Sequence, residues 1–264
     1  MREAPPFRHF LITRFNLNYG DLYPYSEDWM RHRMDLFARF CQPSVRRQTS
    51  QNFTWLVYFD RARTVPYLDR LAPLLDDPRF RAIHIDDPAE MLADIRARAG
   101  TGQALLTSRL DNDDMLHPEF IARLHARAAQ AAPGELPLVI DFPTLTWWRE
   151  GSPRAQRFRS DVVSPFASVL EAPGPTGWES GPWGDGPRTV LIARHENLRA
   201  RIGRVEDMPD PLSMTVLHAN NVSNGQARFG GLGRLLRAWR DRESTLSRAE
   251  TKRVLAEFGL SGKG

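Results

Sequence analysis

The sequence predicts an α/β protein with a mostly parallel sheet flanked by helices. Four short apolar segments alternate with segments of helical periodicity over the first 130 residues. This alternation is typical of parallel sheets, in which a helix carries the chain from one strand to the next. With 264 residues, 41% of them hydrophobic, the chain is long enough for one large domain.

The expected strands are short and rich in aromatic and β-branched residues. The first four cover residues 8–15, 53–60, 79–86 and 103–110, and residues 136–148 supply one or two more. The helices between and after them cover residues 27–41, 64–75, 88–99 and 117–130. Ser26 is the expected N-cap of the first helix, and Pro43 is expected to end it.

The second half of the chain is less regular. Residues 172–188 are dense in Gly, Pro and Trp and predict a long irregular loop. Residues 188–200 predict a strand and a short helix. A further strand within 214–225 ends on His218 and precedes an Asn-rich turn.

The last thirty residues predict two helices. The basic segment RLLRAWRDR, 234–242, is either a solvated packing helix or a surface that touches anionic lipid. Ser247 and Glu250 form a capping box that opens a short final helix.

Composition excludes several classes of protein. No apolar run approaches the roughly 20 residues of a membrane span, and the run before Arg14 is too short for a signal peptide, so we expect a soluble, unexported protein. Cys41 is the only cysteine, which excludes an intramolecular disulfide and a thiolate metal cage. It is expected to be a small apolar residue on a helix.

The basic residues are almost all arginine, 34 Arg against 2 Lys, at a net charge of +4. This bias suits either a GC-rich bacterial genome or the binding of phosphate by the planar guanidinium. The arginines are spread along the chain and mixed with acids, with no basic run interleaved with aromatics. Nucleic acid is therefore not an expected partner.

Polar residues follow the expected strands where each one ends. In parallel sheets, ligands bind beyond the carboxyl ends of the strands. These ends carry Thr13 with Arg14, then Asp60, Asp86 and the cluster Asp111–Asp114. Acids alone would repel a phosphorylated ligand. A divalent cation bound between the acids and the phosphate would remove this repulsion.

Asp111 and Asp113 are spaced so that both carboxylates can reach one hard cation, such as Mg²⁺ or Mn²⁺. The alternative is a solvated turn that caps the following helix, a role open to Asp114. A calcium loop of the EF-hand kind fails on spacing, because its sixth position is Leu116 rather than Gly.

Four stretches together resemble the GT-A glycosyltransferases, and more closely a bacterial family of rhamnosyltransferases. They are HFLITRFNL (9–17), LFARFCQPSVRRQTSQNFTWLVYFD (36–60), LLTSRLDNDDMLHPEFI (105–121) and VLHANNVSN (216–224). The resemblance implies a GT-A-like catalytic domain over 1–232, with a nucleotide-sugar half at about 8–130, an acceptor half at about 131–232, and a helical tail at 233–264.

The resemblance also implies the reaction. A sugar, rhamnose if the family name applies, would pass from a dTDP- or UDP-sugar to a saccharide or lipid-linked acceptor in polysaccharide biosynthesis. Asp111 and Asp113 would bridge Mn²⁺ or Mg²⁺ to the donor diphosphate, with His218 as a further metal ligand. The alternative for His218 is a hydrogen bond to a neighbouring carbonyl. Arg109 would add a second positive contact or pair with the aspartates.

Other site residues follow from the same resemblance. Thr13 and Arg14 would meet the base or ribose of the donor. Asp60 would accept from base or ribose donors or else cap the next helix, and Asp86 is a weaker candidate for the same pocket.

Inverting transfer needs a carboxylate that takes the acceptor proton. Glu206 and Asp207 resemble the Glu-Asp pair that many GT-A enzymes place near the acceptor, and Glu171 competes with them. Each could instead be an ordinary surface acid, and a retaining enzyme needs no such base.

Trp residues divide into two groups. Trp147 and Trp148 are expected in the core, whereas Trp178 and Trp183, in the long loop, are candidates for an acceptor platform.

Two other functions stay open: a nucleotide-sugar-binding protein without turnover, and a metal-dependent phosphotransferase or hydrolase. No GxxxxGK[ST], GxGxxG, HExxH or GxSxG motif occurs. The expected location is the cytoplasm, with contact at the inner face of the membrane as a further option.

Overall fold

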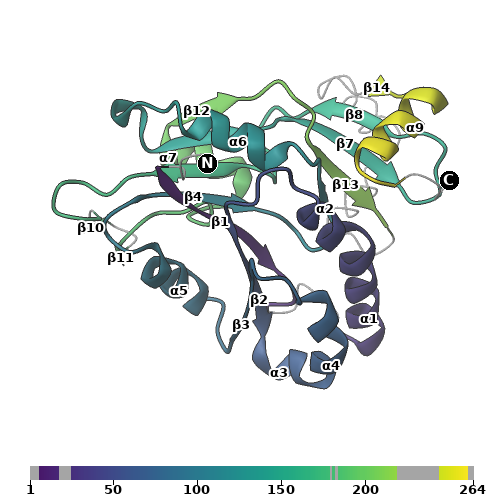
Figure 1. Ribbon diagram of the computed structural model, residues 1–264, viewed down its shortest axis with the longest axis horizontal. Coiled ribbons are helices and arrows are strands. Elements are labelled where there is room, and N and C mark those ends of the chain that lie inside the picture. Colours follow the sequence, from purple (N-terminus) through teal and green to yellow (C-terminus); the bar gives the residue numbers. More distant parts are fainter. Residues whose placement is uncertain (1–5, 18–24, 179, 182–183, 219–243, 261–264) are drawn as a thin grey trace.

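The computed structural model describes residues 6–17, 25–178, 180–181, 184–218 and 244–260. Figure 1 shows a large twisted sheet in the centre and a second sheet to one side, with helices packed around both. The expected basic helix at 234–242 and the turn after His218 lie outside the described residues.

The larger sheet has seven strands in the order β12-β6-β9-β4-β1-β2-β3. Their bounds are β12 Arg204–Asp207, β6 Leu138–Asp141, β9 Ser168–Glu171, β4 Ala104–Arg109, β1 Phe7–Arg14, β2 Thr54–Asp60 and β3 Phe80–Ile85. Only β9 runs opposite to the rest, because it pairs antiparallel with both β4 and β6 while the other pairs are parallel. The expected mostly parallel α/β sheet is therefore confirmed.

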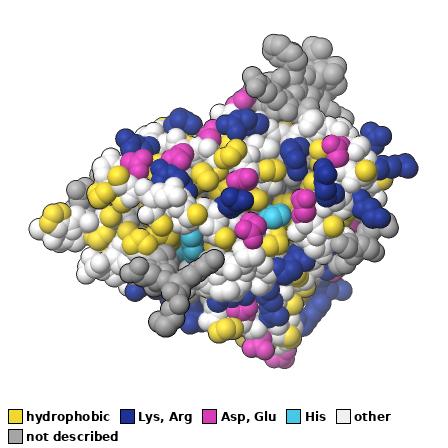
Figure 2. Space-filling model, turned by 45° about the horizontal axis from the view of Figure 1, so that its top comes forward, with side chains coloured by type: hydrophobic (Ala, Val, Ile, Leu, Met, Phe, Trp, Pro, Cys, Tyr) yellow, Lys and Arg dark blue, Asp and Glu magenta, His cyan; other side chains and the backbone are white. Residues whose placement is uncertain are grey.

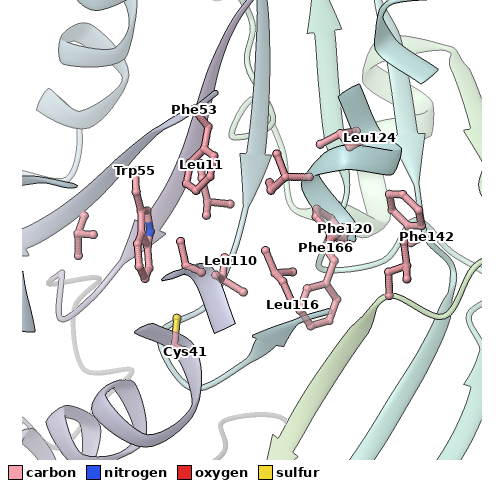
Figure 3. Close-up of a cluster of buried hydrophobic side chains, with 14 of the residues drawn as sticks. Leu11, Cys41, Phe53, Trp55, Leu110, Leu116, Phe120, Leu124, Phe142 and Phe166 are labelled. Atoms are coloured by element: carbon pink, nitrogen blue, oxygen red, sulfur yellow. The ribbon is translucent and has the colours of Figure 1, made fainter. Parts of the chain in front are cut away.

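Helices cover both faces of this sheet, which is why its central strands are buried on both sides. Apolar residues of α1 (Glu27–Leu36), α2 (Gln42–Arg46) and α6 (Phe120–Ala128) pack in one core cluster, part of which Figure 3 shows around Leu11 and Trp55. Those of α5 (Glu90–Ala99) and α7 (Leu198–Ile202) pack in another, against Phe10 and Ile12. Successive residues of β1 thus point to opposite cores.

The smaller sheet has five strands in the order β14-β8-β7-β13-β5. Their bounds are β14 Ser244–Thr245, β8 Gln156–Arg159, β7 Thr144–Arg149, β13 Ser213–Leu217 and β5 Met115–Leu116. The final helix, α9 (Arg248–Glu257), packs Val254 and Phe258 in one cluster with Trp148. Its capping box is confirmed, since Ser247 Oγ accepts from the Glu250 backbone N–H at 3.2 Å.

Two helix predictions need correction. The first helix does not end at Pro43 but continues through a wide turn, η1 (Phe37–Cys41), into α2. There the Gln42 N–H bonds to the Phe37 carbonyl, five residues back, so the turn is wide enough to take a proline that lacks an N–H. The helix expected at 64–75 is broken into short turns. They are α3 (Arg61–Thr64), η2 (Val65–Tyr67), α4 (Leu68–Leu71) and η3 (Ala72–Leu74), with a proline early in both η2 and η3.

The strand expected in 188–200 does not form. The backbone N–H groups of Arg188 and Thr189 bond instead to the Glu171 carboxylate, at 3.0 and 2.7 Å. The chain then enters η5 (His195–Asn197) and α7. Strands β8, β9 and β12 are four residues each and were not expected, because so short a segment shows no clear period.

The remaining described elements are the hairpin β10 (Ser180–Gly181) and β11 (Gly184–Asp185), and the turn η4 (Pro133–Glu135). In the part of the chain that the structure describes, no helix has both the length and the apolar character to cross a membrane.

Candidate active site

The acidic turn follows β4 at the point where the order of the strands reverses. From β1 the chain adds β2 and β3 on one side, whereas β4 pairs on the other side of β1. The carboxyl ends of β1 and β4 therefore lie side by side at a topological switch point, where open α/β sheets bind ligands. The loop after β4 begins at this crevice.

Three hydrogen bonds fix the acidic turn to the end of β1. Leu110 N donates to Ile12 O at 3.0 Å, and Thr13 Oγ1 donates to Leu110 O at 2.8 Å. Asn112 Nδ2 donates to Phe15 O at 2.7 Å. The turn is thus held as rigidly as the strands that carry it.

Thr13 is not placed to meet a ligand. Its side chain is fully buried, and its hydroxyl also accepts from Trp55 Nε1 at 2.9 Å. The predicted contact of Thr13 with base or ribose is therefore corrected: this residue ties β1 and β2 to the acidic turn.

Asp111 lies among arginines beside this switch point. Arg14 approaches one carboxylate oxygen to 3.9 Å and Arg109 the other to 3.5 Å, and the Asp111 side chain is 39% exposed. Burial alone raises the pKa of Asp111, but Arg109, Arg14 and Arg33 outweigh it and hold the pKa below its usual value. The crevice therefore presents two arginines and an ionised carboxylate.

Asp113 lies deeper and has two partners. Its Oδ2 accepts from Arg33 at 2.6 Å and contacts His218 Nε2 at 2.8 Å. Both Asp113 and Arg33 are buried. The structure thus brings His218, directly after β13, beside the second aspartate of the acidic turn.

Helix α1 contributes two site residues that the sequence analysis missed. Arg33 bonds to Asp113 and, at 3.1 Å, to Asn112 Oδ1. His32 Nε2 lies 3.2 Å from His218 Nδ1. The sequence did not indicate their role, because polar residues at these two positions are also what the solvent-exposed face of an amphipathic helix carries.

Asp114 does not cap the following helix. The acidic turn is followed by β5, and α6 begins only at Phe120, after Glu119. Burial raises the pKa of Asp114, and the neighbouring charges of Asp113 and Asp111 raise it further. Within the described part of the chain its Oδ1 is a buried atom with no hydrogen-bond partner.

The donor chemistry of this turn fits a divalent cation. The 2.8 Å between Asp113 Oδ2 and His218 Nε2 is close to the separation of about 3 Å that adjacent ligands show around one ion. An orphaned oxygen of Asp114 lies in the same turn. Among the described residues, however, no three His, Cys, Asp or Glu side chains are already grouped as a ligand set.

Asp60 and Asp86 end the next two strands, β2 and β3. Asp60 Oδ1 accepts from the Arg63 backbone N–H at 2.9 Å, so this residue caps α3, the alternative that its position left open. Asp86 is exposed and pairs with Arg61 at 3.1 Å. Both lie on the carboxyl edge of the sheet, one and two strands beyond Arg14.

The three acids proposed as catalytic base lie away from the acidic turn. Glu171 pairs with Leu105 in the register of β9 and β4, which puts it at the amino edge, about 13 Å along the strand from Arg109. Glu206 pairs with Arg127, whose hydrogen bond lowers the pKa of Glu206.

Asp207 also pairs with an arginine, Arg159, at 2.5 Å. Both Glu206 and Asp207 are on β12, three strands from β4, which corresponds to about 14 Å.

His195 and Glu196 come closer and were missed. His195 Nδ1 contacts Val163 O at 2.6 Å, in the segment whose Ala167 carbonyl accepts from the Arg109 N–H. Burial lowers the pKa of His195, and Arg109 lowers it further. Burial alone raises the pKa of Glu196, but its backbone hydrogen bond, His195, Arg194 and Arg109 together lower it. These two residues do not directly follow a strand, and the sequence analysis looked for site residues at the ends of strands.

The tryptophans predicted in the core are found there, whereas Trp178 does not lie beside the acidic turn. Trp148 is buried and Trp147 packs on Phe158 with ring centroids 4.3 Å apart, as expected of core residues. Trp178 donates to the Gly100 carbonyl, at the amino edge of the sheet, so it is not an acceptor platform beside the acidic turn. Trp183 lies outside the described residues.

Figure 2 shows acidic and basic side chains interspersed on one face of the molecule, with histidines between them. On that face there is no large patch of a single sign of the kind that nucleic-acid-binding proteins present.

The sheet, its switch point and the acidic turn define the GT-A-like α/β class that the sequence predicts. A family model described as "Putative rhamnosyl transferase" matches residues 19–228. The chain therefore belongs to this family and is a glycosyltransferase.

Solved structures give only a distant likeness. Residues 1–349 of TarS from S. aureus match with a TM-score of 0.43 and 11% identity, over 96% of this chain and 70% of that one. The same protein in complex with UDP-GlcNAc matches with a TM-score of 0.38 and 12% identity, over 96% and 71%. Likeness at this level carries no argument about function. No curated protein matches the sequence.

Proposed function

We propose that this glycosyltransferase transfers a sugar from a nucleotide-diphosphate sugar, with Mn²⁺ or Mg²⁺ bound at the acidic turn. The observation that carries the proposal is the position of Asp111 at the switch point, between Arg14 and Arg109 and two residues before Asp113, which contacts His218. Cationic and anionic groups alternate there over a few ångströms. Such a surface suits a diphosphate that arrives with a divalent cation.

The residues that would hold the ion are Asp111, Asp113 and His218. When bound, the ion supplies Lewis-acid stabilisation of the departing nucleoside diphosphate without proton transfer. Arg14 and Arg109 would contact the phosphate oxygens, since a guanidinium binds such oxygens through two parallel donors. On the β2 side, Arg14 and Asp60 would face the nucleoside, with Asp86 further out.

For the acceptor, the geometry favours Glu196 over the three acids selected from the sequence. The Glu196 Oε2 is buried and, among the described residues, lacks a hydrogen-bond partner. Its other oxygen, Oε1, pairs with Arg194 at 2.7 Å, and Oε2 lies 3.4 Å from His195 Nε2. A carboxylate oxygen so placed can take the proton of an acceptor hydroxyl as that oxygen bonds to the sugar and the nucleoside diphosphate leaves.

The identity of the sugar and the acceptor is proposed more loosely. Rhamnose is supported by the family description alone. A saccharide or lipid-linked acceptor, and work at the inner face of the membrane, follow from the same resemblance.

The test measures thermal stability with UDP and dTDP, each with and without Mn²⁺. We expect stabilisation by one of the nucleotides that needs the ion, is lost in Asp111→Asn and persists in Asp69→Asn, a change at an exposed acid of α4. Release of nucleoside diphosphate from the matching sugar donor, with product formed on an added acceptor, then tests the transfer itself. Equal stabilisation by nucleotide with and without the ion would overturn the metal-dependent mechanism.

A further inference from the structure

Helix α1 reaches the acidic turn with two consecutive side chains. Arg33 bonds to Asp113, and His32 Nε2 lies 3.2 Å from His218 Nδ1. The two imidazole rings meet nearly edge to face, with centroids 5.0 Å apart and an interplanar angle of 69°. His32, His218 and Asp113 thus form a continuous chain of contacts that ends on an oxygen of the acidic turn.

The contacts of each ring nitrogen indicate which of them carries a proton in His218 and in His32. His218 Nε2 lies 2.8 Å from a carboxylate oxygen, so without an ion this nitrogen carries the proton and donates it to Asp113. The other nitrogen, Nδ1, then accepts from His32 Nε2–H. To bind an ion through Nε2, His218 must lose that proton and carry one on Nδ1 instead.

His32 can accommodate both states. When His218 carries its proton on Nδ1, that N–H donates a hydrogen bond to His32 Nε2, and His32 carries its own proton on Nδ1. Each ring stays neutral, and the pair holds two protons before and after. An imidazole can switch from donor to acceptor at the same atom, whereas an amide nitrogen or an ammonium group cannot.

We propose that His32 is a positioning residue that holds His218 in the orientation and tautomer required to bind the divalent ion. This proposal rests on the ion of the proposed function. Histidines that bind metals commonly donate their second ring nitrogen to a neighbouring group, and loss of that group weakens binding by roughly 10- to 100-fold.

The backbone of α1 is well anchored for this role. Trp29, Met30 and Met34 of the same helix are buried in the core of the large sheet. Arg33, which follows His32, bonds to both Asp113 and Asn112. The backbone of His32 is therefore held at a fixed distance from the acidic turn, with its ring in contact with His218.

The test is the affinity for Mn²⁺ itself, measured by electron paramagnetic resonance and calorimetry, with and without UDP. His32→Phe keeps a ring and removes both nitrogens, and His32→Gln keeps a polar group that cannot exchange donor for acceptor at one atom. The matched control is His84→Phe, because His84 is a partly exposed histidine on β3 that stacks on Phe59 with centroids 5.4 Å apart.

We expect His32→Phe to weaken Mn²⁺ binding by about 10- to 100-fold, His32→Gln to weaken it less, and His84→Phe to leave it unchanged. Urea unfolding without the ion checks that each variant is folded. If His32→Phe does not fold, His32→Gln takes its place in the comparison. Binding of Mn²⁺ as tight in both His32 variants as in the wild type would overturn this inference alone. A wild-type protein that binds no Mn²⁺ in either condition would overturn the ion of the proposed function and this inference with it.

Discussion

Arg33 and His218 bind the same oxygen of Asp113, from opposite ends of the chain. Arg33 NH1 lies 2.6 Å and His218 Nε2 2.8 Å from Oδ2. The second aspartate of the acidic turn is therefore part of a buried ion pair that connects helix α1 to the turn, besides being a candidate ligand. Its removal has a structural as well as a functional effect.

The first prediction concerns the two aspartates of the turn. Removal of one partner from a buried pair leaves the other charge uncompensated, so Asp113→Ala should lower the free energy of unfolding by about 3–5 kcal/mol. Asp111 is 39% exposed, and Asp111→Asn should cost at most about 1 kcal/mol. Urea unfolding without the ion measures both. Equal costs would show that the Arg33 pair does not stabilise the fold, and the expected difference makes Asp111→Asn the better variant for binding studies.

The second prediction concerns the proton acceptor. Glu196→Gln should lower kcat by about 10²- to 10⁴-fold, the usual contribution of a general base. The KM for the donor should change little, because Glu196 is not among the residues that would hold the diphosphate. Glu206→Gln and Asp207→Asn are the controls, since both acids lie on β12, three strands from β4 and the acidic turn. A larger loss of kcat in Asp207→Asn than in Glu196→Gln would return the role to the acid selected from the sequence.

The third prediction concerns Asp141, at the end of β6. Burial raises the pKa of this carboxyl to about 6, although its Oδ2 accepts from the Ser164 N–H at 2.9 Å. A folded-state pKa above the unfolded value means that ionisation costs stability as the pH rises from about 4 to above 6.

Asp141→Asn should therefore be more stable than the wild type at pH 7.5, by up to about 3 kcal/mol. At pH 4 the two proteins should be nearly equal. Denaturant unfolding at both pH values measures the difference, and a difference that does not depend on pH would contradict the assignment.

The fourth prediction concerns two histidines in contact, His9, which is buried, and His125, which is half-buried. His9 Nδ1 lies 2.8 Å from His125 Nε2, and burial lowers the pKa of His125 to about 4. Because the folded-state pKa lies below the unfolded value of about 6.5, the neutral pair contributes stability above that pH. This contribution is lost as the pH falls from 6.5 towards 4.

The size of that loss is about 3 kcal/mol when complete. His125→Gln removes the titrating ring, so its free energy of unfolding should fall less than that of the wild type between pH 7 and pH 4.5. Parallel slopes for the two proteins would show that the pair does not control acid sensitivity.

Local patterns were enough to predict the first half of the large sheet. Strands β1 to β4 and helices α1, α5 and α6 are where apolar periodicity placed them, within a few residues, because each buries an apolar face that recurs along the chain. Short strands were missed for the opposite reason. β9 and β12 have four residues each, and they form because neighbouring strands offer unpaired backbone groups.

The candidate site was predictable only in part. Arg109, Asp111 and Asp113 lie within five residues at the end of one strand, so their proximity could be predicted from the sequence. The acids chosen as base were judged on residue type alone, and the structure pairs Glu206 and Asp207 with arginines and places Glu171 at the opposite edge.

The sequence by itself determined the class of the sheet, the edge at which ligands would bind and the aspartates at its centre. These features follow from side-chain periodicity and from short-range order along the chain. The tertiary structure alone decided which side chains from distant segments meet those aspartates. Arg33, His32 and Glu196 reach the site because helices pack at fixed angles on a sheet, and no local pattern encodes which residue of a helix then faces a loop eighty residues away.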